Sequence, residues 1–232
     1  GVVPLRLLVL LLVSGLLLVA GSVQASGGAS LHTEARKGGT FNVSFLRNGL
    51  DYVDPALSYS TEGWSLLHAT CARLMNYPDK PRPEGLRLVP EVAASYPRVS
   101  RDGRTYTFTL RTDFRFSDGT PVRASAFAHA INRVLTLEAA NQIFVQDIVG
   151  AEAVRAGRSK AATGVTASRN RLVVRFKRPV FGFAAQTSMP LFCAVPPTLP
   201  TDPEGVGAHH GSGPYYISQY VRGERVVLAR NR

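Results

Sequence analysis

The sequence predicts a mixed α/β fold, on the strength of three observations. Apolar residues make up 45% of the 232 residues, which is enough for a buried core and excludes a disordered chain. The 21 glycines and 15 prolines exclude a coiled coil or a plain helical bundle. Strand-like and helix-like apolar patterns are interspersed without regular βαβ spacing, which favours a mixed arrangement over a doubly wound parallel sheet.

The amino-terminal residues have the pattern of a secretory signal. Arg6 precedes an apolar run over residues 7–20, and small residues up to Ala25 form a cleavage site. A transmembrane anchor is the alternative, but the run is short for a span of roughly 20 residues. We therefore expect a signal peptide over residues 1–25, a flexible polar leader over 26–37 and a globular region over 38–232.

The first part of the globular region is expected to contain a strand and a helix. Apolar and polar residues alternate over 40–46, which predicts the strand. Ser60 or Thr61 can cap the helix that follows, because a hydroxyl at this position accepts a hydrogen bond from a free N–H of the first turn. The predicted buried stripe of this helix runs from Trp64 to Leu74.

A β-rich region with a central helix comes next. The Asp102-Gly103 pair predicts a tight hairpin turn, since both residues tolerate positive φ angles. The strand after it, residues 105–110, alternates threonines with large apolar residues. Similar patterns predict further elements: helices over 124–135 and 148–156, a strand over 172–176 and a hairpin over 215–229.

The sequence carries no familiar catalytic or nucleotide-binding motif: it lacks a G-x-S-x-G elbow, an H-E-x-x-H pair, a P-loop and a dinucleotide fingerprint. We expect no enzymatic activity, no catalytic residues, no cofactor and no metal site. His209 and His210 are adjacent, but ligation requires converging partners, so a solvated loop explains them better. Asp51 and Asp54 could form a carboxylate pair, although a turn-forming Asp before Pro55 explains Asp54 more simply.

Basic residues outnumber acidic ones by 27 to 16, for a formal net charge of +11. A secreted protein that binds an anionic polymer or a membrane surface is one interpretation, and it predicts steeply salt-dependent retention. A solvated basic face is the simpler one. The residues concerned border the central hairpin and the strand over 172–176: Arg98, Arg101, Arg104, Arg111, Arg115, Arg169, Arg171, Arg175, Lys177 and Arg178.

Several motifs in a fixed order carry a resemblance to a known family. They are Gly38-Gly39-Thr40-Phe41, Asp51 with Asp54-Pro55, the segment 88–93, the segments 100–111 and 116–121, Gly211-Ser212-Gly213-Pro214-Tyr215 and the segment 223–231. In this order they resemble the family-5 extracellular solute-binding proteins, the peptide- and nickel-binding receptors of ABC importers. Single pieces such as DGTP are weak, whereas the ordered series, which covers about Gly38 to Asn231, is specific.

The resemblance implies a fold and a function. The fold is that of a type II, peptide-binding periplasmic-binding-protein-like chain, of which residues 38–232 form the amino-terminal lobe with a β-rich subdomain, ending before the second lobe. The function is the extracytoplasmic substrate-binding component of an ABC importer, which captures oligopeptides, or another small solute, and delivers them to a membrane permease. We expect a monomeric protein that does not bind nucleic acid. It is exported, periplasmic or extracellular, and associated with the membrane through its transporter. One lobe alone should bind peptides no tighter than about millimolar.

The resemblance also indicates site residues, because three segments of relatives line the ligand cleft. In this sequence the segments fall near 58–64, 141–144 and 189–192, and they supply Tyr59, Thr61, Trp64, Gln142, Leu191 and Phe192. Cys71 and Cys193 are the two cysteines. In an exported protein they can form a disulfide, and two unpaired core cysteines are the alternative.

Overall fold

The computed structural model describes residues 38–46 and 49–231, and the chain from Ser44 onwards forms one compact unit. The expected signal peptide and leader lie outside the described residues. The strand predicted over 40–46 is wrong, because this segment has no strand geometry. An alternating pattern becomes a strand only when another strand exchanges hydrogen bonds with it, and none of the described strands pairs with 40–46.

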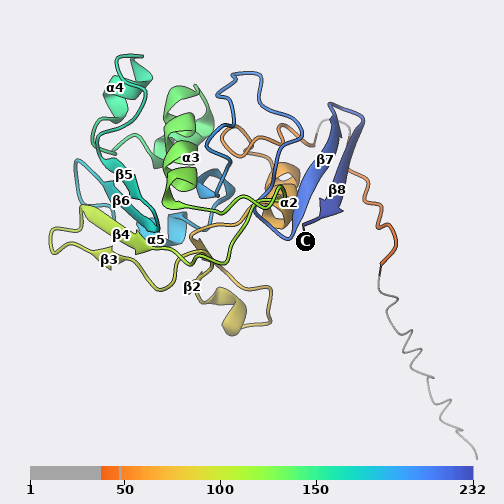
Figure 1. Ribbon diagram of the computed structural model, residues 1–232, viewed down its shortest axis with the longest axis horizontal. Coiled ribbons are helices and arrows are strands. Elements are labelled where there is room, and N and C mark those ends of the chain that lie inside the picture. The colour runs from red at the N-terminus through yellow and green to blue at the C-terminus, as the bar shows by residue number, and fades with distance from the viewer. Residues whose placement is uncertain (1–37, 47–48, 232) are drawn as a thin grey trace, which may run out of the picture. The chain divides into compact units, whose positions relative to one another are not determined.

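One end of the unit is formed by a four-stranded antiparallel sheet with the strand order β3-β4-β6-β5 (Figure 1). Its strands are β3 (Arg98–Val99), β4 (Thr105–Thr109), β5 (Val165–Ser168) and β6 (Arg171–Arg175). The β3–β4 turn, β4 and β6 match the sequence predictions. Strand β5 has no counterpart among them, because only its first residue is buried and the alternating signal is absent.

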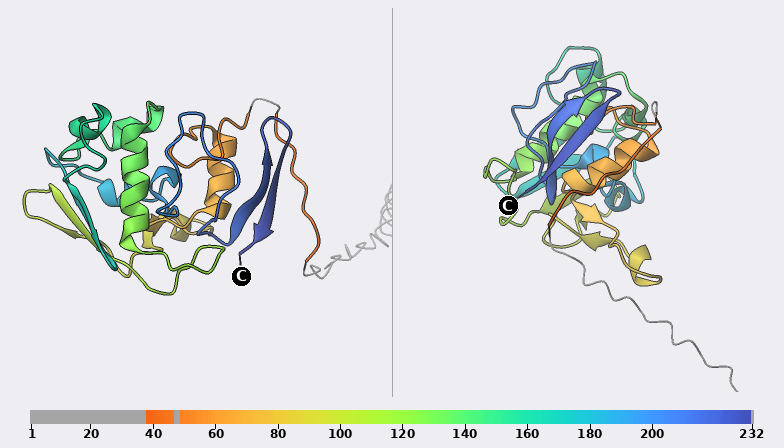
Figure 2. Two further views of the ribbon diagram at one scale, coloured as in Figure 1. Left: turned by 45° about the horizontal axis from the view of Figure 1, so that its top comes forward. Right: turned by 90° about the vertical axis from the view of Figure 1, so that its right-hand side faces the viewer.

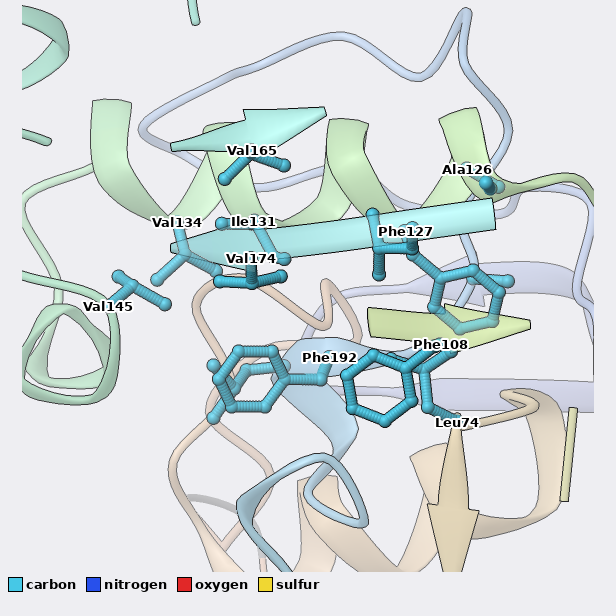
Figure 3. Close-up of a cluster of buried hydrophobic side chains, with 14 of the residues drawn as sticks. Leu74, Phe108, Ala126, Phe127, Ile131, Val134, Val145, Val165, Val174 and Phe192 are labelled. Carbon is cyan, nitrogen blue, oxygen red and sulfur yellow. The ribbon is translucent and has the colours of Figure 1, made fainter. Parts of the chain in front are cut away.

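Helix α3 (Ala124–Thr136) covers one face of this sheet, and the predicted apolar stripe of α3 is buried against it. Figure 3 shows side chains of α3, β4 and β6 gathered in one cluster, among them Phe127, Phe108 and Val174. Phe183 lies at the centre of an edge-to-face group of aromatic rings that includes Phe192, at 5.4 Å between centroids. This core fixes the sheet and α3 as one layered body.

The remaining elements surround that body. The hairpin of β7 (Tyr215–Val221) and β8 (Arg225–Arg230) lies at the opposite end of the unit from the four-stranded sheet, beside α2 (Figures 1 and 2). The others are α2 (Thr61–Thr70), β1 (Met75–Asn76), η1 (Glu84–Leu86), β2 (Val89–Pro90), η2 (Ala140–Phe144), α4 (Ala151–Arg155), α5 (Phe183–Gln186) and η3 (Pro190–Phe192).

The mixed α/β prediction is confirmed, with two shortened helices, because the helix predicted over 148–156 is observed only as α4 and α2 is also shorter than predicted. Helix α2 ends at Thr70, so Cys71 and Leu74 lie beyond it, although both are buried as predicted. Of its predicted stripe, only Leu67 is a fully buried helical residue. Within the described ranges we find no helix whose length and apolar character would suit a membrane span.

Candidate functional site

The carboxylate of Asp51 organises the loop that leads into α2, residues 51–60, which we call the Asp51 loop. One carboxylate oxygen accepts hydrogen bonds from the Tyr52 N–H at 2.7 Å, the Ser58 hydroxyl at 3.1 Å and the Ser60 hydroxyl at 2.7 Å. The other accepts from the Tyr59 and Ser60 N–H groups, at 2.6 and 3.0 Å. Burial alone would raise the pKa of Asp51, but the backbone and hydroxyl hydrogen bonds outweigh it and lower the pKa below its usual value.

The Asp51 loop passes directly into α2 through the predicted cap. Ser60 is in an extended conformation and its hydroxyl accepts from the Gly63 N–H at 3.1 Å, which satisfies a donor of the first turn. Glu62 adds a negative charge at the positive end of the helix. Gly63 is required by close approach, because a Cβ atom there would overlap the Ser58 hydroxyl. The start of α2 is therefore fixed to the loop.

Two aromatic side chains stand on this fixed segment. The rings of Tyr59 and Trp64 pack edge to face, with 5.8 Å between centroids and an interplanar angle of 89°. Trp64 Nε1 donates to the Ser58 carbonyl at 2.9 Å, which orients the indole. Tyr59 is 52% exposed and Thr61 is exposed beside it. Three of the six predicted ligand residues thus come together as a partly exposed surface with apolar faces and hydroxyl groups.

The element η2 supports the Asp51 loop, but through a neighbour of the predicted residue. Asn141 is fully buried, and its amide nitrogen donates to the carbonyls of Ala56 and Ser58, at 3.0 and 3.1 Å. Gln142 instead donates to the carbonyl of Leu135, at 3.2 Å, and to that of the residue after α3. Its amide therefore closes the end of α3, while Asn141 holds the loop.

The other two predicted ligand residues are core residues. Leu191 and Phe192 are each 1% exposed and belong to the same apolar cluster as the sheet and α3. A side chain with so little exposed surface offers a ligand nothing to contact in this structure, and the expectation for these two residues is corrected accordingly. The cause is η3, which turns the apolar segment inward against Phe183.

Asp54 does more than form the predicted turn. Its carboxylate accepts from the Ala56 N–H at 2.9 Å, as a turn-forming Asp does, and it also forms a bidentate ion pair with Arg133 of α3, at 2.9 and 2.6 Å. Both side chains are buried, at 0% and 1% exposure. Arg133 also donates to the Pro200 carbonyl, and Asp54 accepts from the Val206 N–H. The imagined carboxylate pair does not form: Asp51 and Asp54 use separate partners.

Two further features border the Asp51 loop or α2. Cys71, which directly follows α2, is joined to Cys193 in a disulfide, with 5.6 Å between their Cα atoms, and both belong to the apolar cluster that contains Leu67. A surface cleft of about 360 Å³ opens beside Leu57 and is lined also by residues 136–138, Thr201 and Pro203. Within the described residues, no three His, Cys, Asp or Glu side chains converge as they would around a metal ion.

Comparison with known proteins identifies the family. Residues 87–232 match the model of the bacterial extracellular solute-binding proteins, family 5, middle region. The chain belongs to this family. Among curated members it is 31% identical to protein XP55 of Streptomyces lividans over 78% of this chain and 30% of that protein. It is 25% identical to the dipeptide-binding protein DppE of Bacillus subtilis over 90% of this chain and 39% of that protein.

Solved structures of related proteins show the same fold. The substrate-binding domain of an oligopeptide ABC transporter from Bacillus anthracis superposes with a TM-score of 0.68 at 25% identity, over 81% of this chain and 37% of that one. The clavulanic acid biosynthesis oligopeptide binding protein 2 gives 0.63 at 27% identity, over 78% and 34%. The predicted type II, peptide-binding class of fold is confirmed. The family-5 chain described here spans about a third of the length of these relatives.

Proposed function

We propose that this family-5 chain is the extracytoplasmic solute-binding component of an ABC importer, that it captures an oligopeptide, and that it passes the peptide to a membrane permease. The family match over residues 87–232 is the observation that carries the proposal. Relatives named as dipeptide-binding and oligopeptide-binding proteins support a peptide as the ligand. A nickel-binding relative from Escherichia coli, at 30% identity, makes a nickel complex the second candidate.

The partly exposed surface of Tyr59, Thr61 and Trp64 is the part of the chain that we propose contacts the peptide. Aromatic faces pack against apolar peptide side chains, and their polar groups tolerate water at the edge of the contact. The Asp51 loop is held by its own hydrogen bonds before a ligand arrives, so little conformational entropy is lost on binding. Residues 38–232 act in this proposal as the amino-terminal lobe.

Trp64 provides a direct test, because it is the single tryptophan of the chain. Its fluorescence, and the NMR signal of its indole N–H, report on this surface alone. Titration with a pool of three- to five-residue peptides, extended to about 10 mM to cover a millimolar Kd, should shift both signals. Free amino acids and a nickel–histidine complex serve as comparisons. A response to the nickel complex and not to peptides would overturn the choice of ligand.

A matched pair of variants tests the site itself. Tyr59→Ala should weaken peptide binding by about tenfold, since a partly buried aromatic contact is worth on the order of 1–2 kcal/mol. Tyr77→Ala removes a tyrosine of similar exposure, 44%, and should leave the titration unchanged. Equal effects of the two variants would exclude the proposed surface.

Export is part of the proposal and has its own measurement. The protein recovered from outside the cytoplasm should begin at Ser26, as found by mass spectrometry of its amino-terminal peptide, if the signal is cleaved after Ala25. Deletion of the gene in its source bacterium should abolish uptake of the bound peptide. Retention of residues 1–25 in the mature protein would contradict the signal-peptide assignment.

A further inference from the structure

A second surface, remote in sequence from the Asp51 loop, is built of arginines. A cleft of about 460 Å³ opens where the segment after β4, the β5–β6 turn and the start of α3 meet. Four arginines line this cleft, which we call the arginine cleft: Arg111, Arg115, Arg123 and Arg169. The carbonyl of Arg169 accepts from the N–H of Ala124, which joins the turn to α3.

The positive charge of the arginine cleft is largely uncompensated. Arg111 forms an ion pair with Asp113 at 2.5 Å. Among the residues that the structure describes, no carboxylate lies within ion-pair distance of Arg115, Arg123 or Arg169. Like charges gathered around one concavity repel one another, and a multivalent anion would relieve that repulsion. Helix α3 also begins there without a side-chain cap or an acidic residue in its first turn.

Arg169 occupies a backbone position that disfavours it. Its φ angle is +46°, in the left-handed region where glycine and asparagine are preferred in a hairpin turn. The preferred residue type is directly adjacent, at Asn170. The backbone of the turn therefore does not account for an arginine at position 169, whereas a role for its side chain in the arginine cleft does.

The exposed face of the four-stranded sheet is basic, like the arginine cleft. None of its four strands contains an acidic residue. The register pairs Thr109 with Arg171 and Thr105 with Arg175, and an antiparallel pair shares one face, so guanidinium and hydroxyl groups stand side by side. Arg98 joins this face opposite a third threonine. The arginine cleft and this face, together the basic face, meet at the β5–β6 turn.

We propose that the basic face binds a linear phosphate polymer, with one phosphate group held in the arginine cleft and its neighbours along the sheet. A chain of phosphate anhydrides offers several acceptor oxygens, and the guanidinium fork matches phosphate geometry in bidentate hydrogen bonds. Arginines spread over an open sheet face do not enclose a small ligand, but they can contact a long one repeatedly. This inference is independent of the peptide proposal, since it uses none of the same residues.

The test uses the full chain and a fluorescently labelled inorganic polyphosphate, with anisotropy measured across a series of salt concentrations. The cleft variant combines Arg115→Gln, Arg123→Gln and Arg169→Asn. The control variant removes the same charge from exposed arginines elsewhere: Arg87→Gln, Arg158→Gln and Arg225→Gln. The cleft variant should weaken binding at least about 30-fold and reduce the slope of log affinity against log salt by about 1, because one phosphate is held in the cleft and each phosphate contact contributes roughly 0.7–0.9 to that slope.

Each outcome decides the proposal. A loss in the cleft variant, with a change of less than about threefold in the control, supports it. Equal losses in both variants would reduce the effect to diffuse net charge, and absence of polyphosphate binding at physiological salt would overturn it. Vesicles with anionic phospholipid headgroups are the competing probe, and stronger retention on them would assign the face to a membrane surface instead. Asparagine suits the backbone of the β5–β6 turn better than arginine does, so the melting temperature of the single variant Arg169→Asn should be unchanged or higher. Weaker binding by this variant is then a loss of contact and not a loss of folding.

Discussion

The four-stranded sheet with α3 and the Asp51 loop with α2 are held in place by different interactions. In the sheet region, apolar side chains such as Phe108 and Ile131 pack in one buried cluster. In the loop region, position is set by a buried ion pair, a carboxylate that accepts five hydrogen bonds, and a disulfide. The sheet region is thus held by apolar packing, whereas the loop region presents a rigid, partly exposed surface, because directional bonds fix exposed residues that apolar packing cannot reach.

Among the variants that test these two regions, removal of the disulfide should cause the largest loss in the free energy of unfolding. Cys71 and Cys193 are 122 residues apart, and closing so long a loop restricts the unfolded chain by about 5 kcal/mol in the chain-entropy model. The double variant Cys71→Ala/Cys193→Ala should lower the free energy of unfolding by up to that amount, measured by urea denaturation. Wild type in strong reductant provides the parallel measurement. An unchanged unfolding midpoint in both would show that the bond contributes nothing to the loop region.

The buried ion pair should give the next largest effect. Arg133→Met leaves the Asp54 carboxylate buried without its cation, which costs about 3–5 kcal/mol in comparable cases. The control is Arg178→Met, which breaks an exposed pair with Asp147 and should cost less than about 1 kcal/mol. Asp54→Asn combined with Arg133→Met removes the unpaired buried charge and should restore part of the lost free energy of unfolding. The recovery is partial because Asp54 also accepts hydrogen bonds from two backbone N–H groups, and an amide has only one acceptor oxygen. A cost for Arg133→Met as small as that of the control would contradict the role of the pair.

The sequence predicts the sheet region far better than the loop region, and the reason is physical. Apolar burial repeats with the period of the element, so α3 and β4 are visible as patterns. The loop region depends on single polar contacts between distant residues, such as Asp54 with Arg133, 79 positions apart, and these leave no periodic signal. The sequence offered one sign of this pair: Arg133 interrupts the apolar face of α3, and a buried arginine requires an acidic partner, which Asp54 of the Asp-Pro turn supplies.

The same distinction explains the site residues. Tyr59, Thr61 and Trp64 follow one another closely, so a single local segment brings them together. Leu191 and Phe192 are apolar residues in an apolar segment, and sequence alone cannot distinguish a ligand-facing residue of this kind from a core residue. Only the turn at η3, which directs both inward, decides between the two.

Asp51→Asn should change the surface of Tyr59, Thr61 and Trp64 more than it changes the free energy of unfolding. An amide offers one acceptor oxygen where the carboxylate offers two, so several hydrogen bonds of the loop are lost, at a cost of about 1–3 kcal/mol. The pKa of Asp51 is lowered in the folded state, so its contribution is present above its unfolded value, near 3.8, and is lost as the pH falls through the lower folded value. The stability difference between wild type and variant should therefore shrink below about pH 4.

Urea denaturation at pH 7, 5 and 3 measures that difference, and Trp64 fluorescence follows the surface in the same samples. The pKa values of Asp102, Asp113 and Asp118 are lowered as well, by hydrogen bonds from Ser100, Arg111 and Thr120 respectively, so wild type alone would not isolate Asp51. Comparison of the two proteins removes those common contributions. A difference that stays constant down to pH 3 would show that the ionised carboxylate does not hold the loop.

Ile131→Val should cause the smallest loss in the free energy of unfolding, and it tests the sheet region where the preceding variants test the loop region. Ile131 is 1% exposed in the cluster between α3 and the sheet, and removal of one methylene from such a site costs about 0.5–1.5 kcal/mol. The hydrogen-bonded link between the Asp51 loop and α3 runs through Arg133, and Ile131→Val leaves that link intact, so the fluorescence of Trp64 and its response to peptides should not change. Asp51→Asn should show the reverse balance, a changed Trp64 signal for a similar loss of stability. If Ile131→Val altered the Trp64 titration as much as Asp51→Asn does, the two regions would be one cooperative structure, and the division between an apolar core and a separately fixed surface would not hold.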